Sequence, residues 1–226
     1  MRDIDRWRAI LFIDKIAESG LGDERSEQIR AFLATEHIYL AATREIITKL
    51  ENLNDEFKYS RDHNPIHHLT GRVKTPRRTL EKLKRRGLEL SVASARKHIR
   101  DLAGVRVICS YIDDIYLVAR MLTSQSDVHV VRTIDYIANP KPNGYRSLHL
   151  IVTVPVFLAD SVESVQVEVQ IRTIAMDFWA TLEHELAYSP KERKTEAILR
   201  ELKDCAEVIA ETDVRMQKLY DIVNPS

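Results

Sequence analysis

The first long pattern along the chain is an apolar repeat between Ser26 and Phe57. Apolar side chains recur there at spacings of three, four and seven residues, at Ile29, Leu33, Leu40, Ile47, Leu50 and Phe57. This spacing is typical of one face of a helix, and the segment contains neither Gly nor Pro. A polar stretch from Tyr59 to Ile66 then interrupts the repeat. The pattern predicts a helical N-terminal extension over residues 1–58.

The middle of the chain, from about Leu69 to Thr173, alternates short strand and helix patterns. β-branched and other apolar residues predict strands over residues 104–112, 128–134 and 147–157. In a fourth strand, over 165–171, apolar residues alternate with polar ones, which leaves one polar face. Asp113 is the predicted N-cap of a helix, and residues 135–146, which include two prolines, are a predicted loop. Together these patterns predict an α+β fold in which helices flank a mixed β-sheet.

Two further helices are predicted near the C-terminus, over about 174–188 and 195–223, with a break at Ser189–Pro190. A 4-3-4-3 spacing runs along the second of these helices, at Ile198, Leu202, Cys205, Ile209, Thr212, Met216, Leu219 and Val223. Such a stripe fits either an oligomer contact or packing on the chain's own core. We therefore expect three parts, over residues 1–58, 59–190 and 191–226, and the last is a candidate oligomer contact.

Composition restricts the class of protein. Lys plus Arg and Asp plus Glu both number 34, so net charge gives no indication of an anionic partner. The two cysteines have no metal-ligand spacing, which argues against a disulfide framework or a structural zinc site. The charged N-terminus does not resemble a secretory signal, and no apolar run approaches the length of a membrane span. We expect a cytoplasmic protein that does not associate with membranes.

A strongly basic helix is predicted between Gly71 and Gly87. Thr75 suits its N-cap, Pro76 its first turn and Gly87 the position after its end. From Arg72 to Arg86 there are eight basic residues and one acid. Clustered cations of this kind bind polyphosphates through charge-assisted hydrogen bonds. On this pattern alone, a solvated helix, a nucleic-acid surface and a nucleotide-phosphate site all remain open.

Two carboxylates stand at related places in the predicted sheet. Asp101 directly precedes the strand over 104–112, and Glu168 lies on the polar face of the strand over 165–171. Carboxylates on neighbouring strands in an Arg-rich setting suit Mg²⁺ that is also bound by phosphate oxygens. The alternative is a pair of ordinary surface acids in ion pairs.

The loop from Asn139 to His149 carries the most distinctive polar set. Lys141, Tyr145, Arg146 and His149 lie close together around a turn. An exposed Tyr can stack on a base, and a neighbouring Lys or Arg can meet a phosphate. The alternative is that Tyr145 fills the edge of the core.

Five ordered blocks in this chain resemble the synthetase domain of the RelA/SpoT family, and in particular its small single-domain members. The blocks span roughly residues 60–190, and they run from His68 to Lys74, Arg100 to Val107, Asp135 to His149, Val167 to Thr173 and Phe178 to His184. The resemblance implies a nucleotidyltransferase-like sheet and a GTP diphosphokinase. Such an enzyme transfers pyrophosphate from ATP to the 3′-hydroxyl of GTP or GDP, with GMP a third candidate acceptor, and releases AMP during the stringent response.

The resemblance also implies roles for individual residues. Asp101 and Glu168 would hold Mg²⁺ on ATP, and Glu168 would help to deprotonate the 3′-hydroxyl. The implied ATP-binding residues are Arg72, Lys74, Lys82, Arg85 and Arg106. The implied guanine-nucleotide residues are Lys141, Tyr145, His149, Gln170 and Asp177, with Tyr145 stacking on the base.

Other implications concern activity and assembly. Many relatives carry a basic residue where this chain has Ile134, and Arg132 lies two positions earlier, so the preferred acceptor stays open. The chain contains no His-Asp dipeptide, and about 60 residues precede the blocks, so no alarmone hydrolysis is expected. Members of the family assemble, and we expect a homo-oligomer, either dimer or tetramer, with RNA as a candidate regulator. The alternative function is an RNA-binding regulatory module that uses residues 72–86.

Overall fold

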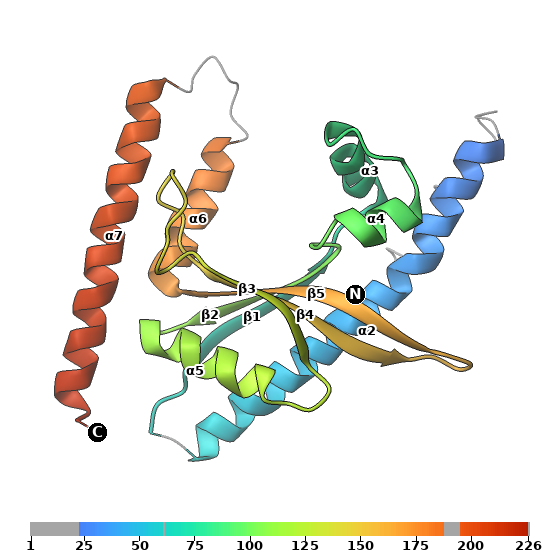
Figure 1. The fold of residues 1–226 in the computed structure, drawn as a ribbon. Coiled ribbons are helices and arrows are strands. Elements are labelled where there is room, and N and C mark those ends of the chain that lie inside the picture. The colour runs from blue at the N-terminus through green and yellow to red at the C-terminus, as the bar shows by residue number, and fades with distance from the viewer. Residues whose placement is uncertain (1–22, 61, 188–194, 226) are drawn as a thin grey trace.

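Five strands form a single sheet at the centre of the protein (Figure 1). The computed structural model describes residues 23–60, 62–187 and 195–225. The sheet order is β1-β2-β5-β4-β3, with β2 and β5 parallel and the other neighbours antiparallel. The strands are β1 (Ile66–Val73), β2 (Ala103–Cys109), β3 (His129–Asp135), β4 (Leu148–Phe157) and β5 (Val162–Thr173). This arrangement confirms the predicted α+β fold with a mixed sheet.

Two helices, α2 (Asp23–Ser60) and α5 (Ile112–Thr123), cover one face of the sheet (Figure 1). The buried alternate residues of β5 face these helices, as the predicted alternation requires, and they form the main core with Ile46, Leu50 and Phe57 of α2. Gly71 lets α2 approach β1 closely, because a Cβ at this position would collide with the side chain of Ile47. The neighbouring residue Arg72 consequently belongs to the opposite face of the sheet.

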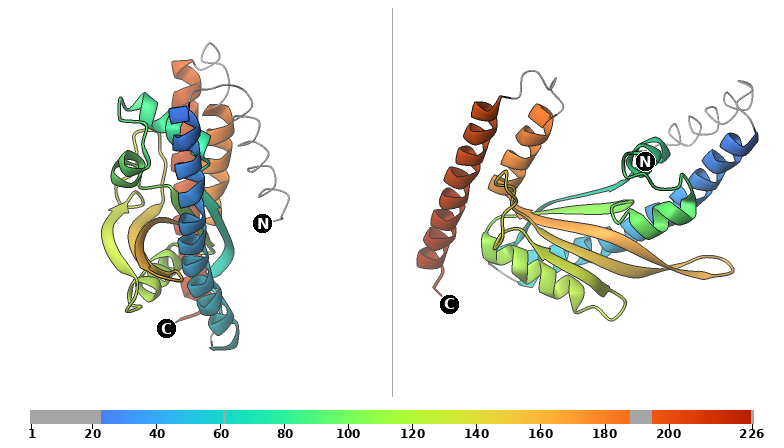
Figure 2. Two further views of the ribbon diagram at one scale, coloured as in Figure 1. Left: turned by 90° about the vertical axis from the view of Figure 1, so that its right-hand side faces the viewer. Right: turned by 45° about the horizontal axis from the view of Figure 1, so that its top comes forward.

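The remaining helices stand at the two ends of the opposite face (Figures 1 and 2). At one end α3 (Pro76–Arg85) and α4 (Val92–His98) share a small core of their own, which contains Leu83, Ala95 and Ile99. At the other end α6 (Ile174–Ala187) packs beside α7 (Glu196–Val223). The free face of the sheet therefore lies between these two pairs of helices (Figure 1).

Several local predictions are confirmed. The N-terminal apolar repeat is helix α2, although residues 1–22 of the predicted extension lie outside the described part of the chain. The side chain of Thr75 caps α3, Pro76 occupies its first turn, and Gly87 has a positive φ of 65°. The predicted break at Ser189–Pro190 also lies outside the described residues.

Other local predictions were wrong or incomplete. Asp113 is not the N-cap of α5, because the helix begins at Ile112 and Tyr111 is its N-cap. The carboxylate of Asp114 accepts a hydrogen bond from the backbone N–H of Tyr111 and satisfies that end of the helix. Strand β1 and helix α4 were not predicted. An exposed edge strand such as β1 lacks the regular apolar alternation that reveals buried strands.

Helix α7 divides its apolar residues between two environments. Ala206 is buried and Ile209 packs beside it against Trp179 of α6. From the predicted stripe, however, Ile198, Met216, Leu219 and Val223 remain exposed in this chain. Within the described residues, no helix is long and apolar enough to cross a membrane.

Candidate active site

The polar face of β5 brings together the residues of the candidate site. Val167, Val169 and Ile171 are buried on the core side, so Glu168, Gln170 and Arg172 lie on the free face. Strand register then sets their neighbours. Glu168 lies opposite Gly104, which itself lies opposite Arg72, whereas Gln170 lies between Arg106 and His149.

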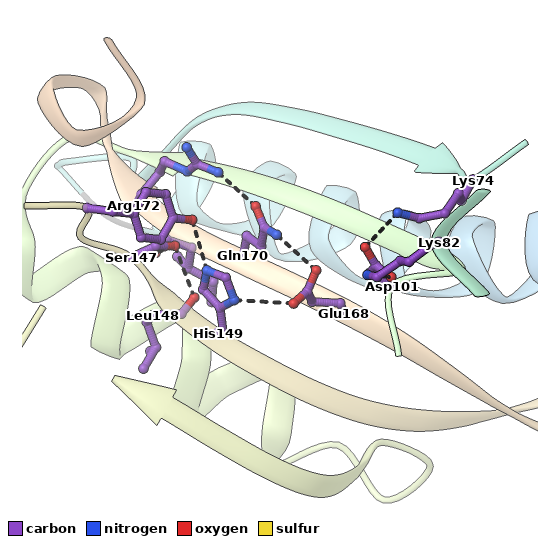
Figure 3. Close-up of polar contacts among 11 residues, drawn as sticks. Lys74, Lys82, Asp101, Ser147, Leu148, His149, Glu168, Gln170 and Arg172 are labelled. Carbon is purple, nitrogen blue, oxygen red and sulfur yellow. Dashed lines mark hydrogen bonds and ion pairs between the residues drawn. The ribbon is translucent and has the colours of Figure 1, made fainter. Parts of the chain in front are cut away.

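One end of this face, called the donor end here because the family resemblance implies that its residues bind the phosphate donor ATP, holds an aspartate between two lysines (Figure 3). Asp101 precedes β2, Lys74 follows β1, and Lys82 reaches over from α3. The ammonium groups lie 2.7 Å (Lys74) and 2.8 Å (Lys82) from the two carboxylate oxygens of Asp101. Burial favours the neutral acid, but the two ammonium groups outweigh it and hold the pKa of Asp101 below its ordinary value. The chain thus neutralises one carboxylate with two cations that the sequence predicts to bind ATP.

Glu168 stands in a hydrogen-bonded chain that continues away from these lysines (Figure 3). One of its oxygens is 3.2 Å from Nδ1 of His149, and the other accepts a hydrogen bond of 2.9 Å from Gln170. Nε2 of His149 is in turn 2.9 Å from the hydroxyl of Tyr145. Burial opposes ionisation of Glu168, yet His149 and Gln170 lower its pKa below the ordinary value. Glu168 is therefore ionised at neutral pH.

The other end of this face, called the acceptor end here because the family resemblance implies that it binds the guanine nucleotide, is an aromatic and cationic cluster. Nζ of Lys141 lies 4.7 Å from the ring centre of Tyr136 and 4.4 Å from that of Tyr145. The ring of Tyr136 also meets His149 edge-on, with centroids 5.1 Å apart. Sequence reasoning missed Tyr136, although it stands in one of the five blocks and within nine residues of Tyr145.

A buried arginine was also missed. The side chain of Arg172 is only 3% exposed, its guanidinium lies 5.6 Å from the ring centre of Tyr145, and it donates a hydrogen bond of 2.8 Å to Gln170. Asp177, in the first turn of α6, lies 3.5 Å from Arg172 and 3.4 Å from Arg106. Asp177 therefore lies between Arg106, which is predicted to bind ATP, and Arg172, which lies beside Tyr145 at the end predicted to bind guanine.

Two predicted residues have a looser relation to this network. Arg72 on β1 and Arg85 on α3 both lie exposed at the donor end. Arg146, named above as a candidate phosphate contact, donates hydrogen bonds from Nη1 to the carbonyl oxygens of Gly144 and Ala206. All twelve predicted site residues thus lie on or beside one face of the sheet, and ten of them take part in the contacts described above.

The carboxylates of Asp101 and Glu168 suit a divalent cation that is bound together with substrate. Asp101, just before β2, and Glu168, on the neighbouring strand β5, lie on the same side of the sheet (Figure 3). In the described part of the chain, no group of three or more His, Cys, Asp and Glu side chains could hold a metal alone. Two carboxylates fit a cation that completes its coordination with phosphate oxygens and water.

We expect the Asp101→Asn variant to lose about 2 kcal/mol of folding stability at pH 7, because two charge-assisted hydrogen bonds lose their anion. The pKa of Asp101 is lower in the folded than in the unfolded chain, so its stabilisation is complete above the ordinary value of 3.8. It is lost as the pH falls through the folded pKa. Urea unfolding of both proteins between pH 7 and pH 3 should show the difference shrinking only below about pH 4. A difference that is constant with pH would contradict this ion-pair role.

Comparison with known proteins identifies the family. The model of the region found in RelA / SpoT proteins matches residues 71–193. GTP pyrophosphokinase YwaC of Bacillus subtilis (strain 168) is 45% identical over 179 residues, which cover 79% of this chain and 85% of that protein. GTP pyrophosphokinase YjbM of the same organism is 38% identical over 80% of this chain and 84% of its own length.

Solved structures agree with the sequence relatives. The small alarmone synthetase 1 from Bacillus subtilis bound to its product pppGpp aligns with a TM-score of 0.76 and 38% identity, over 82% of this chain and 94% of that one. The small alarmone synthetase 2 from Bacillus subtilis gives 0.75 and 42%, over 83% and 97%. Because the family model matches more than half of the chain and these relatives cover most of it, the chain belongs to the RelA/SpoT family.

Proposed function

We propose that this protein is a (p)ppGpp synthetase that transfers pyrophosphate from ATP to the 3′-hydroxyl of GTP or GDP. The observation that carries the proposal is the position of Glu168, an ionised carboxylate between the lysine-bound Asp101 and the Tyr145 cluster. The related small alarmone synthetase 1 has been solved with pppGpp and with AMPCPP. A nucleotide donor and a guanine product fit the two ends of the site described above.

The donor end would bind the triphosphate of ATP. Lys74 and Lys82 both form ion pairs with the carboxylate of Asp101. Arg72, Arg85 and Arg106 add positive charge around them. Several fixed cations stabilise the charge that develops on a transferring phosphoryl group without reorganisation during the reaction. When bound, Mg²⁺ at Asp101 and Glu168 would add further positive charge beside the phosphates of ATP.

The acceptor end would bind the guanine nucleotide. The ring of Tyr145 would stack on the guanine base, and Lys141, whose ammonium group lies over that ring at 4.4 Å from its centre, would supply a cation for a phosphate. Asp177 presents a carboxylate that accepts hydrogen bonds, which complements the N–H groups on the guanine edge. His149 and Gln170 connect this end to Glu168 through direct hydrogen bonds.

The reaction follows from this placement. The 3′-oxygen of the acceptor attacks the β-phosphorus of ATP, the bond from that phosphorus to the oxygen bridging to the α-phosphate breaks, and AMP leaves. Glu168 receives the proton of the hydroxyl. Positioning and charge stabilisation supply most of the rate acceleration in phosphoryl transfer of this kind.

The preference among GTP, GDP and GMP as acceptors would depend on residues of β3. The β-bulge lies between Val130 and Arg132, so pairing is regular from Arg132 to Ile134 and both residues belong to the same face. Arg132 is exposed there, and it would take the place of the basic residue that many relatives carry at the position of Ile134.

We propose that the protein acts as a homo-oligomer in which a second copy covers the exposed apolar residues of α7. Light scattering tests this assembly.

The decisive experiment is product analysis with purified protein, ATP, Mg²⁺ and each of GTP, GDP and GMP. We expect AMP and a 3′-pyrophosphorylated guanine nucleotide in equal amounts. If no acceptor yields AMP, the synthetase proposal is wrong. Salt-sensitive RNA binding in that case, retained by Asp101→Asn and Glu168→Gln variants, would instead favour the RNA-binding module at residues 72–86.

A further inference from the structure

The loop that carries Tyr145 is held from two sides. This acceptor loop, residues 136–147, joins β3 to β4. Within it, the N–H of Gly144 donates to Lys141 O at 2.8 Å, and the N–H of Lys141 donates to Tyr145 O at 3.1 Å. These short-range bonds fix the turn itself. They do not fix where the turn stands above the sheet, which requires a contact to another element.

One such contact is with α7, and a second joins Nδ2 of Asn143 to Oε1 of Glu183 on α6 at 3.4 Å. Gly144 has a φ of 89°, and a Cβ on it would collide with the Cβ of Ala206, so the loop backbone lies directly against the helix. Nη1 of Arg146 donates to Gly144 O at 3.1 Å and to Ala206 O at 3.3 Å. One guanidinium group therefore joins the acceptor loop to the middle of α7. Tyr145 itself packs beside the buried cluster of Trp179, Ala180 and Ala206.

Helix α7 is in turn anchored to the elements that carry the site. The indole N–H of Trp179 on α6 donates to Leu202 O at 2.9 Å. The hydroxyl of Thr173, at the end of β5, donates to the buried carboxylate of Asp213, and it also accepts the N–H of Met176 at the start of α6. The contacts of Leu202 and Asp213, together with that of Ala206 with Arg146, thus place α7 relative to α6, β5 and the acceptor loop. A helix held in this way can act as a fixed support for the loop.

We propose that Arg146 is a positioning residue that fixes Tyr145 for the acceptor by clamping the acceptor loop onto α7. The proposal rests on the proposed function, because it takes the guanine nucleotide as the ligand of Tyr145. It extends the working site to α7, which lies beyond the region that matches the family, residues 71–193. Arg146 does not bind substrate in this account. It acts by fixing the position of the Tyr145 ring.

The test is steady-state kinetics on Arg146→Ala, with Arg146→Lys as the conservative variant and Arg200→Ala as the control. Arg200 is an exposed arginine on the same helix. We expect Arg146→Ala to raise the KM for the acceptor about tenfold with little change in the KM for ATP, since the carbonyl oxygens of Gly144 and Ala206 lose their charged donor. Arg146→Lys, whose ammonium can still donate to a carbonyl, should recover most of the loss, and Arg200→Ala should resemble the wild type.

The number of acceptor phosphates separates positioning from direct binding. If Arg146 positions the loop, Arg146→Ala raises the KM for GMP, GDP and GTP by the same factor. If it binds the acceptor phosphates instead, the factor grows from GMP to GTP, and the proposal is wrong. A loss confined to kcat, or equal increases in the KM for ATP and for the acceptor, would also overturn it, because a merely structural defect affects both substrates.

A second readout does not depend on turnover. Hydrogen exchange at the Gly144 and Lys141 amides should be faster in Arg146→Ala than in the wild type and Arg200→Ala, because the loop loses its support. Unchanged exchange at both amides would overturn the clamp. A wild-type protein that forms no AMP would instead contradict the proposed function, while the exchange comparison could still be read. The two failures are therefore distinguishable.

Discussion

Replacing Glu168 by Gln is expected to lower kcat by a factor of about 10² to 10⁴, the range for loss of a positioned proton acceptor. The substitution keeps the size of the side chain but removes its charge. The carboxylate oxygens face Nδ1 of His149 and the amide of Gln170, and the amide that replaces them can satisfy only one of these partners as an acceptor. The fold should survive, because the neighbouring apolar residues of β5 remain buried on the other face.

The measurement is AMP release at saturating ATP and acceptor, together with thermal unfolding of each protein. Glu201→Gln is a matched control, because Glu201 is an exposed glutamate on α7. A titration with Mg²⁺ adds a second observable: if Glu168 helps to hold the cation, half-maximal rate in Glu168→Gln needs a higher concentration. Near-wild-type turnover in Glu168→Gln would show that both its metal and its proton assignments are wrong.

Much of the fold could be predicted from periodicity. The alternation along β5 identifies its buried and polar faces, and it placed Glu168 and Gln170 on one surface without knowledge of the neighbouring strands. The caps of α3 were equally readable, because Thr75, Pro76 and Gly87 each have a specific local conformational role. Signals of this type depend on a few adjacent residues, so they do not require tertiary structure.

Contacts between distant segments could not be predicted in the same way. In the structure Lys82 of α3 pairs with Asp101, whose other oxygen pairs with Lys74, the residue after β1. That arrangement depends on how α3 docks beside the sheet. The contact of Arg146 with α7 could not be predicted for a similar reason, because its partner is a backbone carbonyl 60 residues away, and a carbonyl has no sequence signature.

Replacing Tyr145 by Ala is expected to raise the KM for the guanine acceptor about 10- to 100-fold, because stacking on an aromatic side chain contributes about 1–3 kcal/mol per base. The KM for ATP should change little, since the cations of the donor end, Lys74 and Lys82, are held by Asp101. Initial rates measured over a range of each substrate separate the two constants. Equal effects on both substrates would indicate a general defect in folding and would contradict a stacking role.

Tyr145→Phe separates the ring of this residue from its hydroxyl. The variant keeps the stacking surface and loses the contact of 2.9 Å with His149, the residue that connects the ring to Glu168. We expect it to bind the acceptor nearly as well as the wild type and to differ in kcat. Because hydrogen bonds from His149 lower the pKa of Glu168, weaker placement of His149 should raise that pKa, and the acid side of the rate profile should move to higher pH. If Tyr145→Phe loses as much affinity for the acceptor as Tyr145→Ala, the hydroxyl of Tyr145, and not its ring, binds the guanine base.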